Sequence, residues 1–352
     1  MNSKWKILGI NIISLVIIGC LLWFSDIANV WDLILTVPWY FYVIFLILYG
    51  CSFLIRADIW KKIFDRLGYS MSFTSLYYAT GVAWMVNQLI PGRMGELARI
   101  EIVTKSQKVE YGTSIVSIAL VRLFDLVVMI ALILTGLLFL NYTFLRSSDF
   151  SSIPYSHEIQ IGIFIGISLI LALLVAFFII LKYPQFIVMM GSKISPKLGL
   201  WIDKLLNPIT EGLLSFRTKP NRSAFILFVI CETLLTWIID CGIIVILCNI
   251  LNLPVHPFVP FLRLLITFLL HIIPTTPGNW GVSEFIWAGF ILVFYPGFAL
   301  QYLVSLYFIE HLLRYVYAIC FGVISLPRTN YKFRISKEPV QKVEDQNDIE
   351  KN

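Results

Sequence analysis

The sequence predicts an all-α integral membrane protein with about six full transmembrane helices and two re-entrant hairpins of broken helix, arranged as an inverted repeat. Hydrophobic residues make up 59% of its 352 residues and charged residues only 14%, whereas a soluble domain carries about 25% charged residues. The mean hydropathy is +0.84. A Pro-Gly-x-x-Gly motif followed by a glutamate occurs once in each half of the chain.

Six apolar stretches are long enough, or nearly so, to cross a bilayer core, which needs about 20 helical residues. They are Ile7–Phe24, Leu33–Ile55, Ser114–Leu140, Ile161–Leu181, Ser223–Leu251 and Ala299–Leu326. The first follows Lys4 and Lys6 and could be a signal peptide, but no small-residue cleavage site comes after it. We therefore predict an uncleaved first helix.

The distribution of Lys and Arg predicts the orientation of these spans. One set of connectors carries most of the cations, in the N-terminal segment, residues 56–66, the loop 182–222 and the segment from Arg328 onward. The other set, residues 25–32 and 141–160, holds only Arg146. Because Lys and Arg concentrate on the cytoplasmic side, we expect a multi-pass protein of the cell membrane with both termini in the cytoplasm.

Two further apolar regions, Ser72–Ile90 and Phe258–Phe294, are interrupted or flanked by the Pro-Gly motifs. The first is followed by four cations, which a complete crossing would place outside; these are Arg93, Arg99, Lys105 and Lys108. A hairpin that enters from the cytoplasm and turns near Pro91-Gly92 avoids this conflict. The second region predicts a mirror-image hairpin from the outer face. If both hairpins crossed completely, the chain would show eight to ten apparent spans.

The two motifs also predict an inverted repeat, since each half of the chain carries one of them. Shifting the first half so that Pro91 falls on Pro277 places the second span over the fifth and the third over the sixth, but the first span falls in the basic loop. We predict a membrane domain at 1–326, with halves of about 1–150 and 155–326, and a disordered polar tail at 327–352. Short amphipathic segments such as Leu198–Leu206 are expected in the cytoplasmic loop 182–222. Interrupted apolar segments at matching positions of two halves indicate a transporter-like binding site.

Ionisable residues within the spans are expected to face the protein interior and to pair with one another. Arg122 and Asp125 share one helix face, as do Glu310 and Arg314, while Glu232 and Asp240 have no obvious cation in their own span. Arginines can hold a phosphate, and the carboxylates can orient them or receive a cationic headgroup. The alternative is a set of internal salt bridges that fix helix packing. The candidate headgroup site comprises Asn87, Pro91, Gly92, Arg93, Gly95, Glu96, Arg99, Arg122, Asp125, Glu232, Asp240, Arg263, His271, Pro277, Gly278, Gly281, Glu284, Glu310 and Arg314.

Other chemistry has little support in the sequence. It contains no Gly-rich nucleotide loop and no metal-ligand spacing, and its six cysteines lie inside apolar runs. We therefore predict no catalytic residue, metal or cofactor. The net charge of +6 comes from the basic loops, so we expect membrane lipids rather than nucleic acid as partners.

The motif Asn87-x-x-x-Pro91-Gly92-Arg93-x-Gly95-Glu96, followed by Arg99, resembles the signature of the lysylphosphatidylglycerol synthase/flippase transmembrane family. Arg122-x-x-Asp125 and Pro277-Gly278-x-x-Gly281-x-x-Glu284 are similar to its other hallmarks, and the resemblance spans about residues 5 to 326. It implies a flippase-like domain. In the multiple peptide resistance factors this domain moves aminoacylated phosphatidylglycerol to the outer leaflet, which repels cationic antimicrobial peptides, and is joined to a cytosolic lysyltransferase. We expect a stand-alone member without that enzyme domain.

The leading hypothesis is a lipid flippase or scramblase for aminoacylated phosphatidylglycerol or a lipid-linked glycan. Without a visible ATP site, movement would be downhill or coupled to protons or other ions. One alternative is a membrane-embedded enzyme that modifies lipids with Glu96 or Glu284 as acid or base, which family labels would call a phosphatidylglycerol lysyltransferase. Another is a non-catalytic partner of a lipid or glycan synthase. The sequence also leaves open whether the protein forms a homo-oligomer.

Overall fold

A computed structural model provides the fold. It describes residues 27–90, 93–107, 109–140, 182–200, 220–253, 255–256, 276–295 and 297–329, together with isolated positions within 16–23, 161–179 and 202–207. Helices are the only regular secondary structure in these ranges, which confirms the predicted all-α membrane fold.

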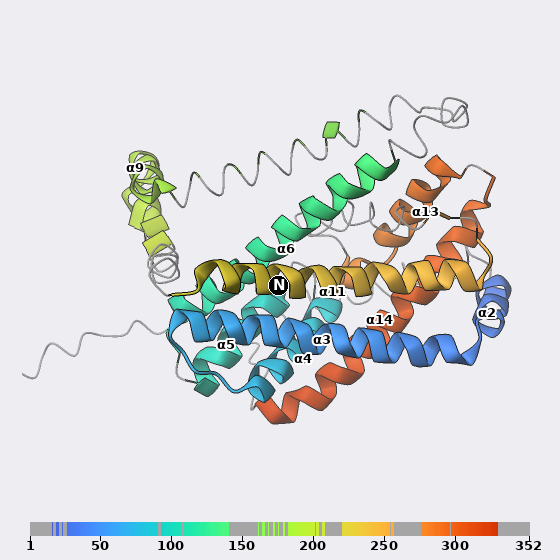
Figure 1. The fold of residues 1–352 in the computed structure, drawn as a ribbon, viewed down its shortest axis with the longest axis horizontal. Coiled ribbons are helices and arrows are strands. Elements are labelled where there is room, and N and C mark those ends of the chain that lie inside the picture. The colour runs from blue at the N-terminus through green and yellow to red at the C-terminus, as the bar shows by residue number, and fades with distance from the viewer. Residues whose placement is uncertain are drawn as a thin grey trace, which may run out of the picture.

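Four long helices form the frame of the molecule: α3 (Trp39–Leu67), α6 (Tyr111–Leu140), α11 (Arg222–Ile250) and α14 (Leu300–Thr329). Each is long and apolar enough to cross a membrane. They correspond to the second, third, fifth and sixth predicted spans. Helices α3 and α11 run along the long axis, and α6 and α14 cross it obliquely (Figure 1). The predicted spans at 7–24 and 161–181 lie largely outside the described residues.

The predicted boundaries of the second span were wrong at both ends. A separate helix, α2 (Ile27–Thr36), precedes it, and the extended Pro38 (φ −66°, ψ 147°) separates α2 from α3. Helix α3 then continues through the predicted basic connector to Leu67. Its 29 residues extend about 44 Å, more than the roughly 30 Å hydrocarbon core. Hydropathy marks the part of a helix that lies in lipid, whereas the hydrogen-bonded helix extends beyond it.

The first Pro-Gly motif forms the tip of a helical hairpin made of α4 (Phe73–Leu89) and α5 (Met94–Gln107). At its open end, Gln107 Nε2 donates to Ser75 Oγ at 3.2 Å. At its tip, the backbone N–H of Gly95 donates to Asn87 Oδ1 at 2.8 Å. The 17 residues of α4 extend only about 25 Å, less than the bilayer core. The hairpin therefore turns back, as predicted.

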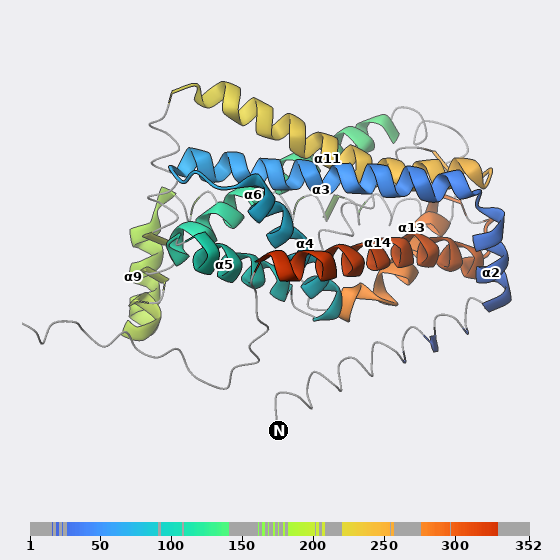
Figure 2. The same ribbon diagram turned by 90° about the horizontal axis from the view of Figure 1, so that it is seen from below.

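The second motif forms a comparable tip, made of the short 3-10 helix η2 (Pro277–Asn279) and the start of α13 (Val282–Phe294). A Cβ atom built on Gly278 would lie 2.7 Å from Gln88 Oε1, so this tip touches the first one. From the two tips, α5 and α13 lead to opposite ends of the bundle (Figures 1 and 2). The other arm of the second hairpin lies outside the described residues.

The long helices of the two halves match in length. Helices α3 and α11 have 29 residues each, and α6 and α14 have 30 residues each. Aligning these pairs end to end gives a register that differs from the alignment of Pro91 with Pro277 by less than one helical turn. Helices α3 and α11 also lie side by side and run in opposite directions (Figures 1 and 2), as an inverted pair must.

Two glycines allow the first hairpin to pack closely on the last helix. A Cβ atom on Gly81 of α4 would lie 2.4 Å from Ser325 Oγ, and one on Gly322 of α14 would lie 2.2 Å from Met85 Cβ. Small residues at such crossings let the backbones of membrane helices approach closely. The hairpin of the first half is thus held by a helix of the second half.

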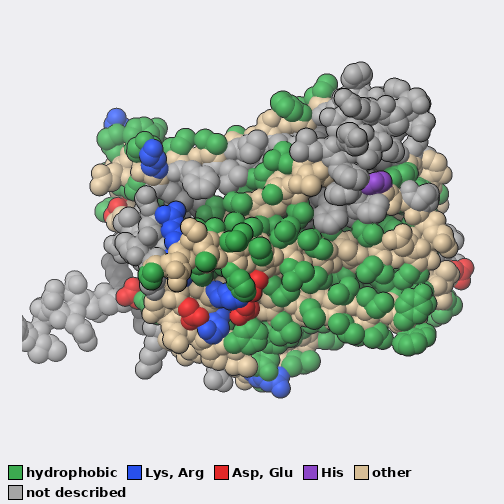
Figure 3. All heavy atoms as spheres, in the orientation of Figure 1, with side chains coloured by type: hydrophobic (Ala, Val, Ile, Leu, Met, Phe, Trp, Pro, Cys, Tyr) green, Lys and Arg blue, Asp and Glu red, His purple; other side chains and the backbone are tan. Residues whose placement is uncertain are grey.

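Basic helical segments lie at one end of the bundle, where α3 ends. Helix α9 (Pro184–Ile194) is followed by a helical turn that includes Leu198, in the loop where helical segments were expected. Figures 1 and 2 show α9 beside the end of the long helices. Hydrophobic side chains cover most of the face shown in Figure 3, and most charged side chains gather toward the same end. The predicted tail lies almost entirely outside the described residues.

We expect Gly322→Leu to destabilise the protein by about 1–3 kcal/mol, because the added side chain would overpack the contact with Met85. The thermal unfolding midpoint of the purified protein in detergent measures this change. Gly242→Leu is the matched control, since a Cβ atom there meets nothing within 4 Å. Equal midpoints for the two variants would contradict the close crossing of α4 and α14.

Candidate functional site

The tip of the first hairpin carries a set of charged residues, here called the arginine cluster: Glu96, Arg99, Arg122 and Asp125. Glu96 lies in the first turn of α5, where the helix dipole favours a negative charge. Its carboxylate pairs with Arg122 of α6 and lies 3.4 Å from Arg99 Nη1. Arg122 Nη1 donates to Asp125 Oδ2 at 2.9 Å, which places the predicted i,i+3 pair as expected.

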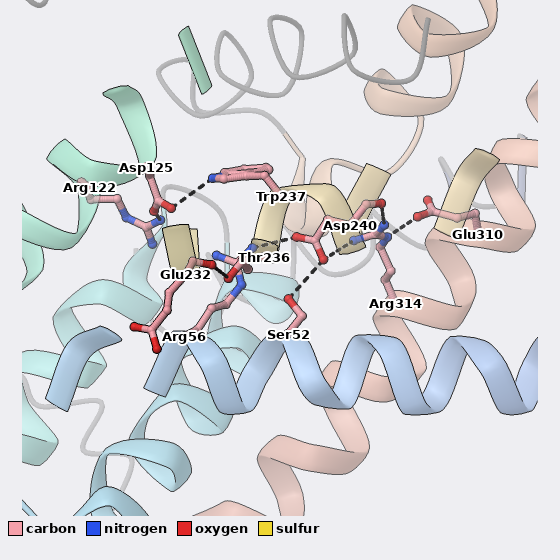
Figure 4. Close-up of polar contacts among 10 residues, drawn as sticks. All are labelled: Ser52, Arg56, Arg122, Asp125, Glu232, Thr236, Trp237, Asp240, Glu310 and Arg314. Atoms are coloured by element: carbon pink, nitrogen blue, oxygen red, sulfur yellow. Dashed lines mark hydrogen bonds and ion pairs between the residues drawn. The ribbon is translucent and has the colours of Figure 1, made fainter. Parts of the chain in front are cut away.

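Aromatic side chains complete the arginine cluster. Trp237 Nε1 on α11 donates to Asp125 Oδ1 at 3.2 Å (Figure 4). The guanidinium of Arg99, a residue only 4% exposed, lies 4.0 Å from the centre of the Trp60 ring. Cations gain several tenths of a kcal/mol or more from such ring contacts when water is excluded. Each charge of the cluster is therefore neutralised by protein groups, as its depth in the molecule requires.

A second network is centred on Asp240 of α11. Arg56 Nη2 of α3 donates to Asp240 Oδ2 at 2.7 Å, and Ser52 Oγ donates to Oδ1 at 3.2 Å. From α14, Arg314 donates to the Asp240 carbonyl at 2.8 Å and pairs with Glu310. Figure 4 shows these side chains converging between α3, α11 and α14. The network connects the two halves of the repeat.

Arg56 was missed as a site residue because the sequence placed it in a cytoplasmic connector. It lies instead in the continued helix α3, with its guanidinium 5.3 Å from the Trp84 ring and 5.5 Å from the Trp237 ring. Glu232, for which its own span offers no obvious cation, pairs with Lys62 of α3. Both partners come from another helix, so the sequence of a single span could not reveal them.

A small cavity lies between the arginine cluster and Arg56. Its volume is about 20 Å³, and it is lined by residues that include Arg56, Thr80, Arg99, Arg122, Asp125 and Thr236. A cavity of this size holds about one water molecule. It is far too small for a lipid headgroup.

Arg93 differs from the other arginines at the tip. It adopts a left-handed backbone conformation (φ 55°) and is half-buried. Its charged neighbours include Glu96 and Arg122. It makes neither a hydrogen bond nor an ion pair with any of the residues that the structure describes. Arg93 is therefore suited to receive an anionic group from outside the protein.

The second hairpin contains a buried carboxylate paired with a histidine. Glu284 is 0% exposed, and its Oε2 accepts from the backbone N–H of Gly281 at 2.8 Å. Its Oε1 lies 2.6 Å from Nδ1 of His311 on α14, which also lies 3.4 Å from Ser283 Oγ. A Ser-His-acid triad uses both ring nitrogens of the histidine. Here both partners meet the same nitrogen, so the group is not arranged as a catalytic triad.

The remaining predicted site residues are distributed as follows. Gly278 (φ 62°) and Gly281 (φ 83°) shape the second tip, and Pro277 is described only by its backbone. Glu232 pairs with Lys62, apart from the hairpin tips. Pro91, Gly92, Arg263 and His271 lie outside the described residues. Within the described part, no cluster of His, Cys, Asp and Glu could hold a metal ion.

Comparison with protein families assigns the whole membrane region. A family model described as the lysylphosphatidylglycerol synthase TM region matches residues 11–322. The chain belongs to this family. Membership in the lysylphosphatidylglycerol synthase TM family connects the chain with membrane lipids. No curated protein and no solved structure matches it.

We expect Asp240→Ala to lower the free energy of unfolding by about 3–5 kcal/mol, because it leaves Arg56 buried without its carboxylate. Denaturant titration in mixed micelles measures this loss. Glu101→Ala is the matched control, since it removes an exposed i,i+4 pair with Lys105 that contributes at most about 1 kcal/mol. Equal losses would show that the Asp240 network does not hold the two halves together.

Proposed function

We propose that this protein moves a polar-headgroup lipid between the leaflets of the cell membrane, as a flippase or scramblase. The observation that supports this most is Arg93, a cation without a described partner at the tip of a membrane-inserted hairpin. The arginine cluster lies beside it and adjoins a small polar cavity. Ionisable residues at membrane depth generally mark a substrate or ion pathway.

The chemistry of the cluster favours an anionic cargo. Guanidinium groups bind phosphate through charge-assisted, often bidentate hydrogen bonds. Arg93 would make the first contact with a lipid phosphate, and Arg122 could then exchange Glu96 for the phosphate. Such an exchange keeps every buried charge paired. Aminoacylated phosphatidylglycerol and polyprenyl-linked glycans both carry the required phosphate, and the carboxylates could receive a cationic aminoacyl group.

The arrangement of the hairpins supports alternating access. In transporters with inverted repeats, the substrate site lies between the repeats, which open in turn to each side. Here the two tips touch, and α5 and α13 lead to opposite ends. We place the cytoplasm at the end with Lys61, Lys62 and α9, following the distribution of cations. The first hairpin would then open inward and the second outward, while acyl chains remain in lipid.

We expect Arg93→Ala to slow lipid movement about 10- to 100-fold, because a charge-assisted hydrogen bond contributes about 1.5–3 kcal/mol. The measurement uses purified protein in vesicles with fluorescent or aminoacylated lipid. Arg93→Lys should recover part of the rate. Lys105→Ala, on the same hairpin but with a side chain 64% exposed, should retain the full rate.

Two outcomes would overturn the proposal. One is transfer no faster than in protein-free vesicles for every anionic, aminoacylated and polyprenyl lipid. The other is a covalently altered lipid in the mass spectrum, which would favour a membrane enzyme. Full cellular activity of Arg93→Ala, together with loss of activity on deletion within residues 182–222, would instead indicate a partner of a lipid or glycan synthase.

A further inference from the structure

The two hairpins carry matching carboxylates with different partners. A glutamate follows each Pro-Gly motif, Glu96 five residues after Pro91 and Glu284 seven residues after Pro277. End-to-end alignment of α6 with α14 places Arg122 on His311 and Glu96 one residue beyond Glu284. Glu96 pairs with an arginine, which is always charged. Glu284 pairs with a histidine, the side chain whose charge changes near neutral pH. Of the two pairs, the second alone therefore contains a side chain of the kind that proteins use to carry protons.

The surroundings hold this pair in one arrangement. The backbone of Gly281 and the hydroxyl of Ser283 donate to one carboxylate oxygen of Glu284, which leaves the other for His311. The indole ring of Trp280 stacks on the imidazole, with centroids 4.2 Å apart and an angle of 18°. Residues 280–284 form the tip of the hairpin itself. A change in the charge of the pair therefore acts directly on the tip.

The other ionisable groups around the pair, within the described structure, come from three helices. On α14 itself, Tyr307 lies 6.0 Å from the imidazole by ring centroids, and Glu310 and Arg314 form an ion pair. From α11, Asp240 joins that ion pair, and Cys248 is a neighbour of Glu310. From α3, Tyr49 lies against Arg314 and Arg56 against Asp240. The two carboxylates of this network, Glu310 and Asp240, thus already have arginine partners.

We propose that Glu284 and His311 form a proton-binding site that couples lipid movement to a proton gradient. This inference rests on the proposed lipid transport. When the neutral imidazole donates its Nδ1–H to Glu284 Oε1, the pair carries one negative charge. A proton taken up at Nε2 of His311 makes the pair neutral overall, and its release on the other side restores the negative charge. A buried net charge opposes movement of the tip through a low-dielectric interior. The proton thus changes the relative stability of the inward and outward arrangements, which is the requirement for coupling.

The test uses wild-type protein in vesicles with no pH gradient and with gradients of one unit in either direction. If one proton accompanies each lipid, the rates under opposite gradients should differ, by up to about tenfold relative to zero gradient. His311→Arg replaces the histidine by a permanently charged arginine, as in the Glu96–Arg122 pair of the first hairpin, and should remove this difference. His256→Gln, a change at a histidine outside the pair, should retain it. With the wild-type protein, a pH-sensitive dye enclosed in the vesicles should report that protons enter together with the lipid.

The outcomes separate this inference from the proposed function. Wild-type protein that moves lipid without a gradient but responds to neither gradient would overturn the coupling alone. A full gradient response in His311→Arg would show that Glu284 and His311 are not the proton-binding site. If His311→Arg fails to fold, Glu284→Gln replaces it, with the same expected loss of the gradient response. Absence of lipid movement in all conditions would count against transport itself.

Discussion

The structure depends on one constraint, which is that a charge buried among the membrane helices is costly unless another protein group neutralises it. Asp240 shows how far this requirement shapes the fold. Its carboxylate accepts hydrogen bonds from Arg56 and Ser52 of α3, and its backbone carbonyl accepts one from Arg314 of α14. No single helix could satisfy it. The buried charges therefore determine which helices lie together, and they join the first half of the chain to the second.

The same constraint bears on how the proposed site could bind a lipid phosphate. Most of the buried cations already have carboxylate partners, so under the proposed function an incoming phosphate would replace one anion by another instead of adding an unbalanced charge. Arg93, at the tip, is the exception among the described arginines of the hairpin. The glycine contacts between α4 and α14 add a close packing surface that holds the first hairpin in position. In the proposed transport cycle, opening would disturb this surface.

The sequence was sufficient wherever the deciding feature was local. Helix breakers located the tip of the first hairpin and the turn that precedes α13. The spacing of Arg122 with Asp125 and of Glu310 with Arg314 predicted pairs that the structure contains. It was insufficient where partners come from different helices, as for Arg56 with Asp240 and Lys62 with Glu232. The boundaries of α3 were missed for another reason, since apolar composition reports immersion in lipid rather than the length of the helix. The contact of Glu284 with His311 needs the exact repeat register, which the motif spacing defines only to within a helical turn.

The central claim is that two hairpins from opposite ends of the bundle meet at their tips inside the membrane. The most direct measurement is cross-linking of Gln88→Cys with Gly278→Cys by a short thiol reagent, in native membranes and in a background without the six native cysteines. The account predicts an intramolecular cross-link that is protected from membrane-impermeant thiol reagents on both sides. Absence of the cross-link, with both positions freely labelled from the same side of the membrane, would contradict it.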